Sequence, residues 1–270
     1  KESVGGLLKA LPKLRQKSGH AYVNFGEPIE LDEILKRHNP NWRADAPPDD
    51  SRPPWVGAVV EDLATGIMRN INGAAAVNPV NLLSTALLAT PRQALLATDL
   101  ARQIDMYRRL LAAARYGPRV TICEEDGEAA IRYCESMRIV ERQAHALGDV
   151  LRMSDTNAIL QTYFRNNVVH LFAMPSLIAC CFVNNATMRT EDILRLAWRI
   201  YPYIAEELFL HWREDQVPEV MQEQLRVFVS LGLLTVNTDG TAWSRPPAAT
   251  AEAVQLSLLA QATIQTVERY

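Results

Sequence analysis

The sequence of 270 residues has few cysteines and no long hydrophobic run. Its four cysteines, Cys123, Cys134, Cys180 and Cys181, never form a CxxC pair, which argues against a zinc site or a disulfide framework and indicates a reducing compartment. A bilayer span needs about 20 apolar residues. The most apolar stretch, residues 168–183, is shorter and contains a proline, so a buried or interfacial helix is favoured over a membrane span.

An excess of charge of one sign is lacking, and so are the common catalytic motifs. The net charge is −3, with 48% hydrophobic and 22% charged residues, which is typical of a globular protein without a general attraction for nucleic acid. No G-x-S-x-G, P-loop, GxGxxG or HExxH motif is present. The chain begins with Lys1, without an initiator methionine or a cleavable signal pattern, and we therefore expect it to be the distal part of a longer protein.

The first distinctive segment is GHAYVNFGEPI, residues 19–29. Its alternation predicts a short strand that begins at Tyr22 and ends at Phe25, and Gly26, Glu27 and Pro28 then break it. No second strand is predicted nearby. The strand therefore needs a partner from elsewhere.

A basic amphipathic helix is predicted ahead of this strand. Leucines recur at helical spacing over residues 7–14, among the cations Lys9, Lys13, Arg15 and Lys17. This surface has three interpretations: an ordinary solvated face, a surface that attracts phosphate, or a contact with anionic lipid.

A proline-rich segment divides the chain. Residues 39–54 hold five prolines and almost no apolar residues, which is typical of a linker. A short helix is predicted over 31–38, and beyond the linker the pattern is helical for nearly 180 residues. We therefore expect a mainly α fold, with residues 55–270 as a helical C-terminal domain.

A winged-helix-like order is predicted towards the end of the chain. Helices over 188–210 and 217–232 precede two short runs around Asp239 and Gly240, and Asp-Gly between such runs is a hairpin signal. Residues 188–245 carry six arginines, no lysines and nine acidic residues. Since this net charge repels phosphates, a packing or interaction module is favoured and no nucleic-acid partner is expected.

The densest polar group leads directly into the apolar run. Arg165, Asn166, Asn167 and His170 fall on the first turns of a helix that should be buried. Buried polar groups are costly unless they are paired. These side chains either face an anionic ligand or attach the helix to a neighbouring domain by satisfying loose backbone groups, and the second interpretation is favoured.

Five segments in collinear order resemble one family. ESVGGLLKALPKLR, GHAYVNFGEPIELDEIL, NLLSTALLAT, QTYFRNNVVHLFAMPSL and AEELFLHW are similar to the distal part of the membrane-bound bacterial glycerol-3-phosphate acyltransferases. The resemblance implies transfer of an acyl group from acyl-CoA or acyl carrier protein to the 1-hydroxyl of glycerol 3-phosphate, in phospholipid synthesis. It also implies a place at the cytoplasmic face of the bacterial inner membrane, an anionic surface as partner, and no cofactor.

The catalytic motif of that family is absent from this sequence. The family uses H-x-x-x-x-D, with histidine as general base and aspartate as its orienting group. None of the five histidines is followed by aspartate at the required position. No catalytic, cofactor-binding or metal-binding residue is therefore carried over from the family.

The resemblance nevertheless implies a division of the chain. Residues 1–38 would be the last helix and strand of an α/β acyltransferase domain, followed by the linker and the helical domain. Tyr22, Phe25, Gly26, Glu27 and Pro28 would then meet an upstream acyltransferase domain of the same protein. The alternative is a helical interaction module that docks a carrier protein, a regulator or a membrane surface.

Overall fold

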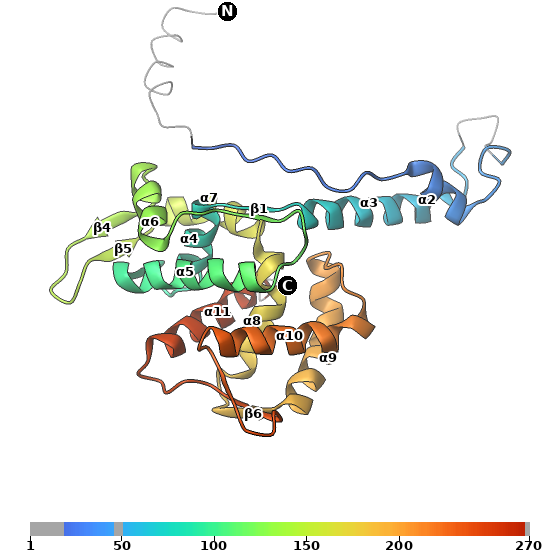
Figure 1. The fold of residues 1–270 in the computed structure, drawn as a ribbon. Helices are drawn as coiled ribbons and strands as arrows, with labels where there is room; N and C mark the ends of the chain where they lie inside the picture. Colours follow the sequence, from blue (N-terminus) through green and yellow to red (C-terminus); the bar gives the residue numbers. More distant parts are fainter. Residues whose placement is uncertain (1–18, 46–50, 268–270) are drawn as a thin grey trace, which may run out of the picture.

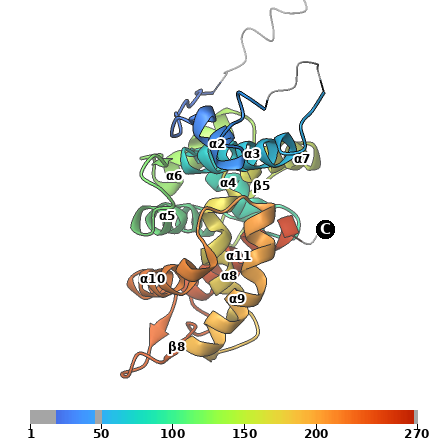
Figure 2. The same ribbon diagram turned by 90° about the vertical axis from the view of Figure 1, so that its right-hand side faces the viewer.

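The computed structural model describes residues 19–45 and 51–267, and the side chains as far as residue 263. This part of the chain is mainly helical, as predicted. The helices, including two short 3-10 helices, are α2 (Leu31–His38), α3 (Val56–Gly73), α4 (Pro79–Leu88), α5 (Ala97–Ala113), α6 (Gly127–Ser136), α7 (Asp155–Asn166), η1 (Val169–Phe172), α8 (Ala173–Cys181), α9 (Thr190–Glu207), η2 (Glu214–Gln216), α10 (Val217–Ser230) and α11 (Ala251–Val267). Figures 1 and 2 show them stacked, with α2 and α3 at one end of the molecule.

The strands in the described residues are short and form small sheets. β1 (Ala76–Val77) pairs in parallel with β3 (Thr121–Ile122). An antiparallel sheet joins β2 (Ala94–Leu96), β5 (Val150–Arg152) and β4 (Glu141–Gln143) in that order. Another joins β6 (Thr187–Arg189), β8 (Ala242–Ser244) and β7 (Thr235–Val236).

One order of elements occurs twice. When β3 and η2 are left aside, α4, β2, α5, α6, β4 and β5 are followed later by α8, β6, α9, α10, β7 and β8, which is the same order of helices and strands. In both sets the first strand runs directly into a helix, and the last strand lies in the middle of its sheet. The second set contains the predicted hairpin, and Gly240 occupies the left-handed region at its turn with φ of 74°.

The core is built around α4 and α8, the most apolar helices. Every residue of α4 is buried, including Ser84, whose hydroxyl donates to Gln161 Oε1 of α7 at 3.0 Å. α8 packs against α11, and Ser176 Oγ donates to the carbonyl oxygen of Ala260 at 3.0 Å. Buried hydroxyls are thus paired within the core, which avoids the cost of burying an unsatisfied polar group.

Proline positions differ from the prediction. The hydrophobic pattern of residues 157–183 predicts one helix that is broken or bent at Pro175. The structure instead ends α7 at Asn166, and the 3-10 helix η1 precedes α8. Pro175 lies in the first turn of α8, where its missing N–H has no helical acceptor to lose. Pro202 lies within α9, which continues through it as a single helix.

The predicted strand near the start has no strand partner among the described residues. Residues 19–30 form an extended segment beside α3 and the β1–β3 pair (Figure 1) and are assigned to no sheet. A strand is defined by its ladder of hydrogen bonds to a neighbour. Without such a neighbour, the segment is held on the domain mainly by side chains.

Candidate functional site

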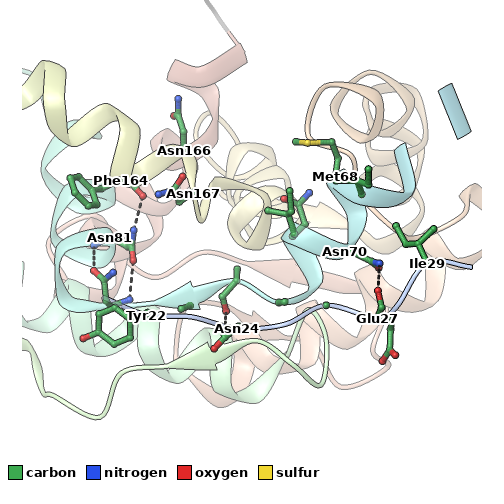
Figure 3. Close-up of a pocket in the computed structure, with 18 of the residues that line it drawn as sticks. Tyr22, Asn24, Glu27, Ile29, Met68, Asn70, Asn81, Phe164, Asn166 and Asn167 are labelled. Atoms are coloured by element: carbon green, nitrogen blue, oxygen red, sulfur yellow. Dashed lines mark hydrogen bonds between the residues drawn. The ribbon is translucent and has the colours of Figure 1, made fainter. Parts of the chain in front are cut away.

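The extended segment 19–30 is attached to the helical domain at three points. His20 stacks on Tyr133 of α6, with ring centroids 5.8 Å apart. Asn24 Nδ2 donates to Thr121 Oγ1 of β3 at 3.0 Å. Near its end, Asn70 Nδ2 of α3 donates to the carbonyl oxygen of Glu27 at 2.7 Å (Figure 3).

The GEP turn is the most tightly held part of this segment. Arg119 Nη2 lies 2.6 Å from Glu27 Oε1, and Arg119 Nη1 donates to the carbonyl oxygen of Phe25 at 3.2 Å. A side chain at Gly26 would place its Cβ 3.0 Å from Asn70 Cβ and 3.1 Å from the Asn70 carbonyl oxygen. Glycine therefore allows this close approach to α3 without a shift of the neighbouring backbone. Pro28 is exposed and precedes α2 by three positions.

The outward side of the segment is apolar and open. Val23 and Phe25 are 73% and 79% exposed, whereas Tyr22, which is 45% exposed, lines a cavity on the other side of the segment. Exposed apolar side chains on an unpaired extended backbone are typical of a surface that another polypeptide covers. This surface, defined by Val23 and Phe25, is named here the outer edge.

A cavity of about 680 Å³ lies between segment 19–30, α3, α4 and the end of α7. Figure 3 shows its labelled asparagines arranged around the opening. Asparagine dominates its polar lining, through Asn24, Asn70, Asn72, Asn78, Asn81, Asn166 and Asn167.

Most of these asparagine side chains form hydrogen bonds with backbone groups. Asn78 and Asn81 form a reciprocal capping box at the start of α4, and Asn81 Nδ2 also donates to the carbonyl oxygen of Phe164 at 2.7 Å. Asn72 Nδ2 donates to the carbonyl oxygen of Leu208 at 2.7 Å. These amides satisfy backbone groups at helix ends, so they bind α3, α4, α7 and the end of α9 together.

The polar group predicted around residue 165 is divided by the structure. Arg165 and His170 are buried, and Arg165 Nη2 donates to Asn166 Oδ1 at 3.0 Å. Asn166 and Asn167 are exposed and line the cavity. The helix ends at Asn166, so side chains that one continuous helix would have placed on neighbouring turns point to different environments.

His170 has a structural contact. Its Nε2 lies 3.0 Å from the carbonyl oxygen of Asn72, and since a carbonyl only accepts, Nε2 carries the proton. Burial lowers the pKa of His170 to about 4, against an opposing effect of the Asn72 carbonyl, and nearby His211 lowers it further. His170 is therefore neutral near pH 7, and its contact joins η1 to the end of α3 within the helical domain.

Several other features do not contribute to this site. The basic surface formed by Lys9, Lys13, Arg15 and Lys17 lies outside the described residues. Within residues 19–45 and 51–267, no group of three or more histidine, cysteine or acidic residues is arranged to hold a metal ion. Over the same ranges, no helix has the length and apolar character of a membrane span.

Sequence reasoning missed Asn70 and Arg119, the residues that hold the GEP turn. No motif marks Arg119, which lies in the loop before β3. Asn70 belongs to the stretch RNINGAAAVNPVN, in which asparagine recurs four times. This high frequency of asparagine could have indicated the site, because asparagine is favoured where a side chain must form hydrogen bonds with otherwise unpaired backbone groups.

The fold and the site together define a mainly helical domain that carries one extended segment with an open apolar edge. All of its residues, 1–270, match the family described as the glycerol-3-phosphate acyltransferase C-terminal region, and the chain belongs to this family. The curated relatives include proteins named glycerol-3-phosphate acyltransferase.

Two of these relatives show the extent of the match. The protein of Xanthomonas campestris pv. campestris is 43% identical over 273 aligned positions, which cover 100% of this chain and 31% of the relative. The protein of Pseudomonas aeruginosa (strain UCBPP-PA14) is 42% identical over 270 positions, which cover 100% of this chain and 32% of the relative. The chain thus spans about a third of the length of these relatives.

Proposed function

We propose that this chain is the C-terminal part of a glycerol-3-phosphate 1-O-acyltransferase. That enzyme transfers an acyl group from acyl-CoA or acyl carrier protein to glycerol 3-phosphate in phospholipid synthesis. The observation that carries the proposal is the family match over all 270 residues, together with relatives of that name at 42–43% identity.

The role of the chain within the enzyme is support of the catalytic domain. No H-x-x-x-x-D motif occurs in its sequence, so the general base and its orienting aspartate belong to the upstream region. The chain is therefore inactive by itself and brings no cofactor; the acyl donor is a co-substrate of the whole enzyme.

The division of the chain follows from this role. Residues 1–38 end the α/β acyltransferase domain, residues 39–54 are the linker, and residues 55–270 are the helical domain. The exposed outer edge supports a partner strand from the upstream domain, because an unpaired apolar strand is unfavourable in water. Each of the two repeated sets of elements, α4 to β5 and α8 to β8, combines helices with a short three-stranded sheet and is a winged-helix-like unit. The sequence predicted the second of these units.

Membrane association is the other part of the proposal. The basic surface formed by Lys9, Lys13, Arg15 and Lys17 would contact anionic headgroups at the cytoplasmic face of the bacterial inner membrane. Binding of the chain to vesicles that contain anionic lipid should fall as salt is raised, and should be lost when these four cations are replaced by glutamine. Salt-independent binding would contradict this contact.

The proposal is tested by comparing two proteins in one assay. The chain with its natural upstream region should transfer an acyl group from acyl-CoA to glycerol 3-phosphate, and the 270-residue chain should not. Acyl transfer by the chain alone would overturn this account of where catalysis occurs.

The same assay tests the outer edge. In the longer protein, Val23→Asp together with Phe25→Asp should reduce acyl transfer and loosen the upstream domain, as judged by limited proteolysis. Leu147→Asp is the control, since Leu147 is an apolar residue of the β4–β5 hairpin that is 83% exposed. An independent interaction module would show no such dependence, and the comparisons do not favour that alternative.

A further inference from the structure

The outer surface of α7 carries apolar side chains that the described residues leave uncovered. Ile159, Leu160 and Tyr163 are 79%, 58% and 65% exposed. Residues that are three or four positions apart share one side of a helix, so these three side chains form one stripe. α7 packs on α4 through other side chains, such as Gln161, which accepts a hydrogen bond from Ser84. The helix is therefore apolar on a side that the core does not use, which is typical of a surface that binds another molecule.

A second apolar stripe lies on α3. Ile67, Met68 and Ile71 are exposed and line the cavity of about 680 Å³, and Phe164 of α7 also lines it. The Phe164 ring lies edge-on to the ring of Tyr163, with centroids 5.6 Å apart. The α7 stripe, the cavity and the α3 stripe are therefore continuous.

Segment 19–30 leads to this surface from the part of the chain that precedes it. The segment runs along the end of the molecule where α3 and α7 lie (Figures 1 and 2). Gly19 lies against the end of α6, where an added Cβ would be 3.0 Å from Tyr133 Oη and 3.5 Å from Met137 Cε. Asn157 Nδ2 of α7 donates to the carbonyl oxygens of the two residues that follow Met137, each at 3.0 Å. The chain ahead of Gly19 thus joins the helical domain close to the first turn of α7.

The polar lining of the cavity favours a polypeptide over a lipid as the partner. Asn166 and Asn167 are exposed and line the cavity between the two stripes, together with Asn24 and Asn70. Amides that are covered by hydrocarbon lose water without gaining a hydrogen bond, which is costly. A polypeptide brings backbone donors and acceptors as well as apolar side chains, so it suits both the stripes and the cavity.

We propose that the α3 and α7 stripes, Ile67, Met68, Ile71, Ile159, Leu160 and Tyr163, form the docking surface for the upstream acyltransferase domain. This inference rests on the proposed function, which places that domain ahead of this chain in the same protein. The chain covers only 31% and 32% of two of its relatives, so the remainder of such a protein is large enough to cover both stripes. The outer edge adjoins the same surface through segment 19–30. One upstream domain can therefore cover the outer edge and both stripes, which fixes its orientation on the helical domain.

Thiol labelling measures whether this surface is covered. Tyr163→Cys and Ile71→Cys, in separate variants, place a thiol on each helix at a position that is exposed in the isolated chain. Each variant is prepared as the 270-residue chain and with its natural upstream region, and its rate of reaction with a maleimide reagent is measured without lipid. Labelling should be about tenfold or more slower in the longer protein, because the thiol then reacts only when the interface opens.

Two controls separate the docking surface from exposed positions elsewhere. Leu147→Cys places a thiol in the β4–β5 hairpin, where Leu147 is 83% exposed. Val236→Cys places one in β7, in the sheet at the opposite end of the molecule (Figure 1). Both should react at similar rates in the two proteins. The parent proteins give the background from natural cysteines, and thermal unfolding checks that each variant is folded.

The labelling rates decide the proposal. Slow labelling of the thiols at positions 163 and 71 in the longer protein, with unchanged rates at positions 147 and 236, supports the docking surface. Equal rates in the two proteins overturn it, and acyl transfer by the longer protein, assayed separately, shows whether the proposed function stands. Protection that requires added phosphatidylglycerol vesicles and not the upstream region would assign the surface to lipid, which also overturns the proposal.

Discussion

His170 couples the stability of the fold to pH. Its imidazole is buried and donates to the Asn72 carbonyl, and burial lowers its pKa from 6.5 to about 4. The unfolded chain therefore binds a proton more readily than the folded chain between these values. The contribution of neutral His170 to the stability of the folded chain is complete above about pH 6.5 and is lost as the pH falls towards 4.

We predict that acid destabilises the chain through this residue. Between pH 8 and pH 5 the free energy of unfolding should fall by about 2 kcal/mol from His170 alone. His170→Gln keeps an N–H donor for Asn72 without a titratable group, so its urea unfolding should depend less on pH. His145→Gln, at an exposed position, should follow the parent chain. Parallel pH profiles for the parent and His170→Gln would contradict the assignment.

Gly127 permits a close approach between α5 and α6. A Cβ at this position would lie 2.1 Å from the carbonyl oxygen of Ala101, so α6 begins against the backbone of α5. Gly127→Ala should lower the free energy of unfolding by about 1–3 kcal/mol or more, because the backbone must move. The matched control is Gly57→Ala in α3, where nothing lies within 4 Å of the added methyl group. That change should be neutral or stabilising by up to about 1 kcal/mol, as chemical unfolding would reveal.

At the scale of elements, the extended segment 19–30 depends on two side chains of the helical domain. Asn70 and Arg119 hold the backbone and carboxylate of the GEP turn through contacts of 2.6–3.2 Å. These contacts are exposed or half-buried, and contacts of this kind contribute little individually. The segment is therefore expected to be released locally without unfolding of the core.

We predict that Asn70→Ala combined with Arg119→Ala increases amide hydrogen exchange in residues 20–27. Global stability should change by no more than about 2 kcal/mol, since two partly exposed interactions are lost. Asn24→Ala serves as a comparison, because it removes the hydrogen bonds of the Asn24 amide to Thr121, Ala75 and Arg119 and leaves the contacts of the turn with Asn70 in place. Unchanged exchange in the double variant would mean that other contacts hold the turn.

At the scale of the whole molecule, the outer edge is exposed in the isolated chain. Val23 and Phe25 are among its most exposed large apolar side chains in the described residues. Unpaired extended segments with apolar side chains associate with one another. We predict that the 270-residue chain self-associates in a concentration-dependent manner by analytical ultracentrifugation. Val23→Asp together with Phe25→Asp should shift it towards monomer.

Leu147→Asp is again the control, and it should leave self-association unchanged because it removes an isolated apolar side chain from a hairpin. A chain that stays monomeric at high concentration would show that the outer edge needs no cover. The test bears on the surface alone, since it measures no activity.

Local sequence patterns predicted many of the elements. The hydrophobic period gives most helices, and Asp239 with Gly240 marks the hairpin because few residues tolerate the left-handed turn. The break after Asn166 was missed, since the helix over 157–183 was expected to be broken or bent at Pro175. Proline is tolerated in a first turn, so Pro175 marks where α8 begins rather than where a helix breaks.

The candidate site was less predictable. Gly26, Glu27 and Pro28 were identified from their strand-breaking pattern, but Asn70 and Arg119, which hold the turn, are more than 40 residues away in sequence. The cluster at Arg165, Asn166, Asn167 and His170 was identified as a unit, yet a helix end separates its buried from its exposed members.

The sequence by itself determined the family, the mainly helical fold and the absence of the catalytic motif, because each of these depends on local periodicity or on fixed spacing. Tertiary structure alone decided which polar side chains meet. Asn72 reaches both His170 and Leu208, and Arg69 lies beside His211, across separations of about 100 residues or more. Such contacts follow from the packing of helices around a shared core. No local sequence pattern encodes which helices pack side by side, or which of their side chains meet.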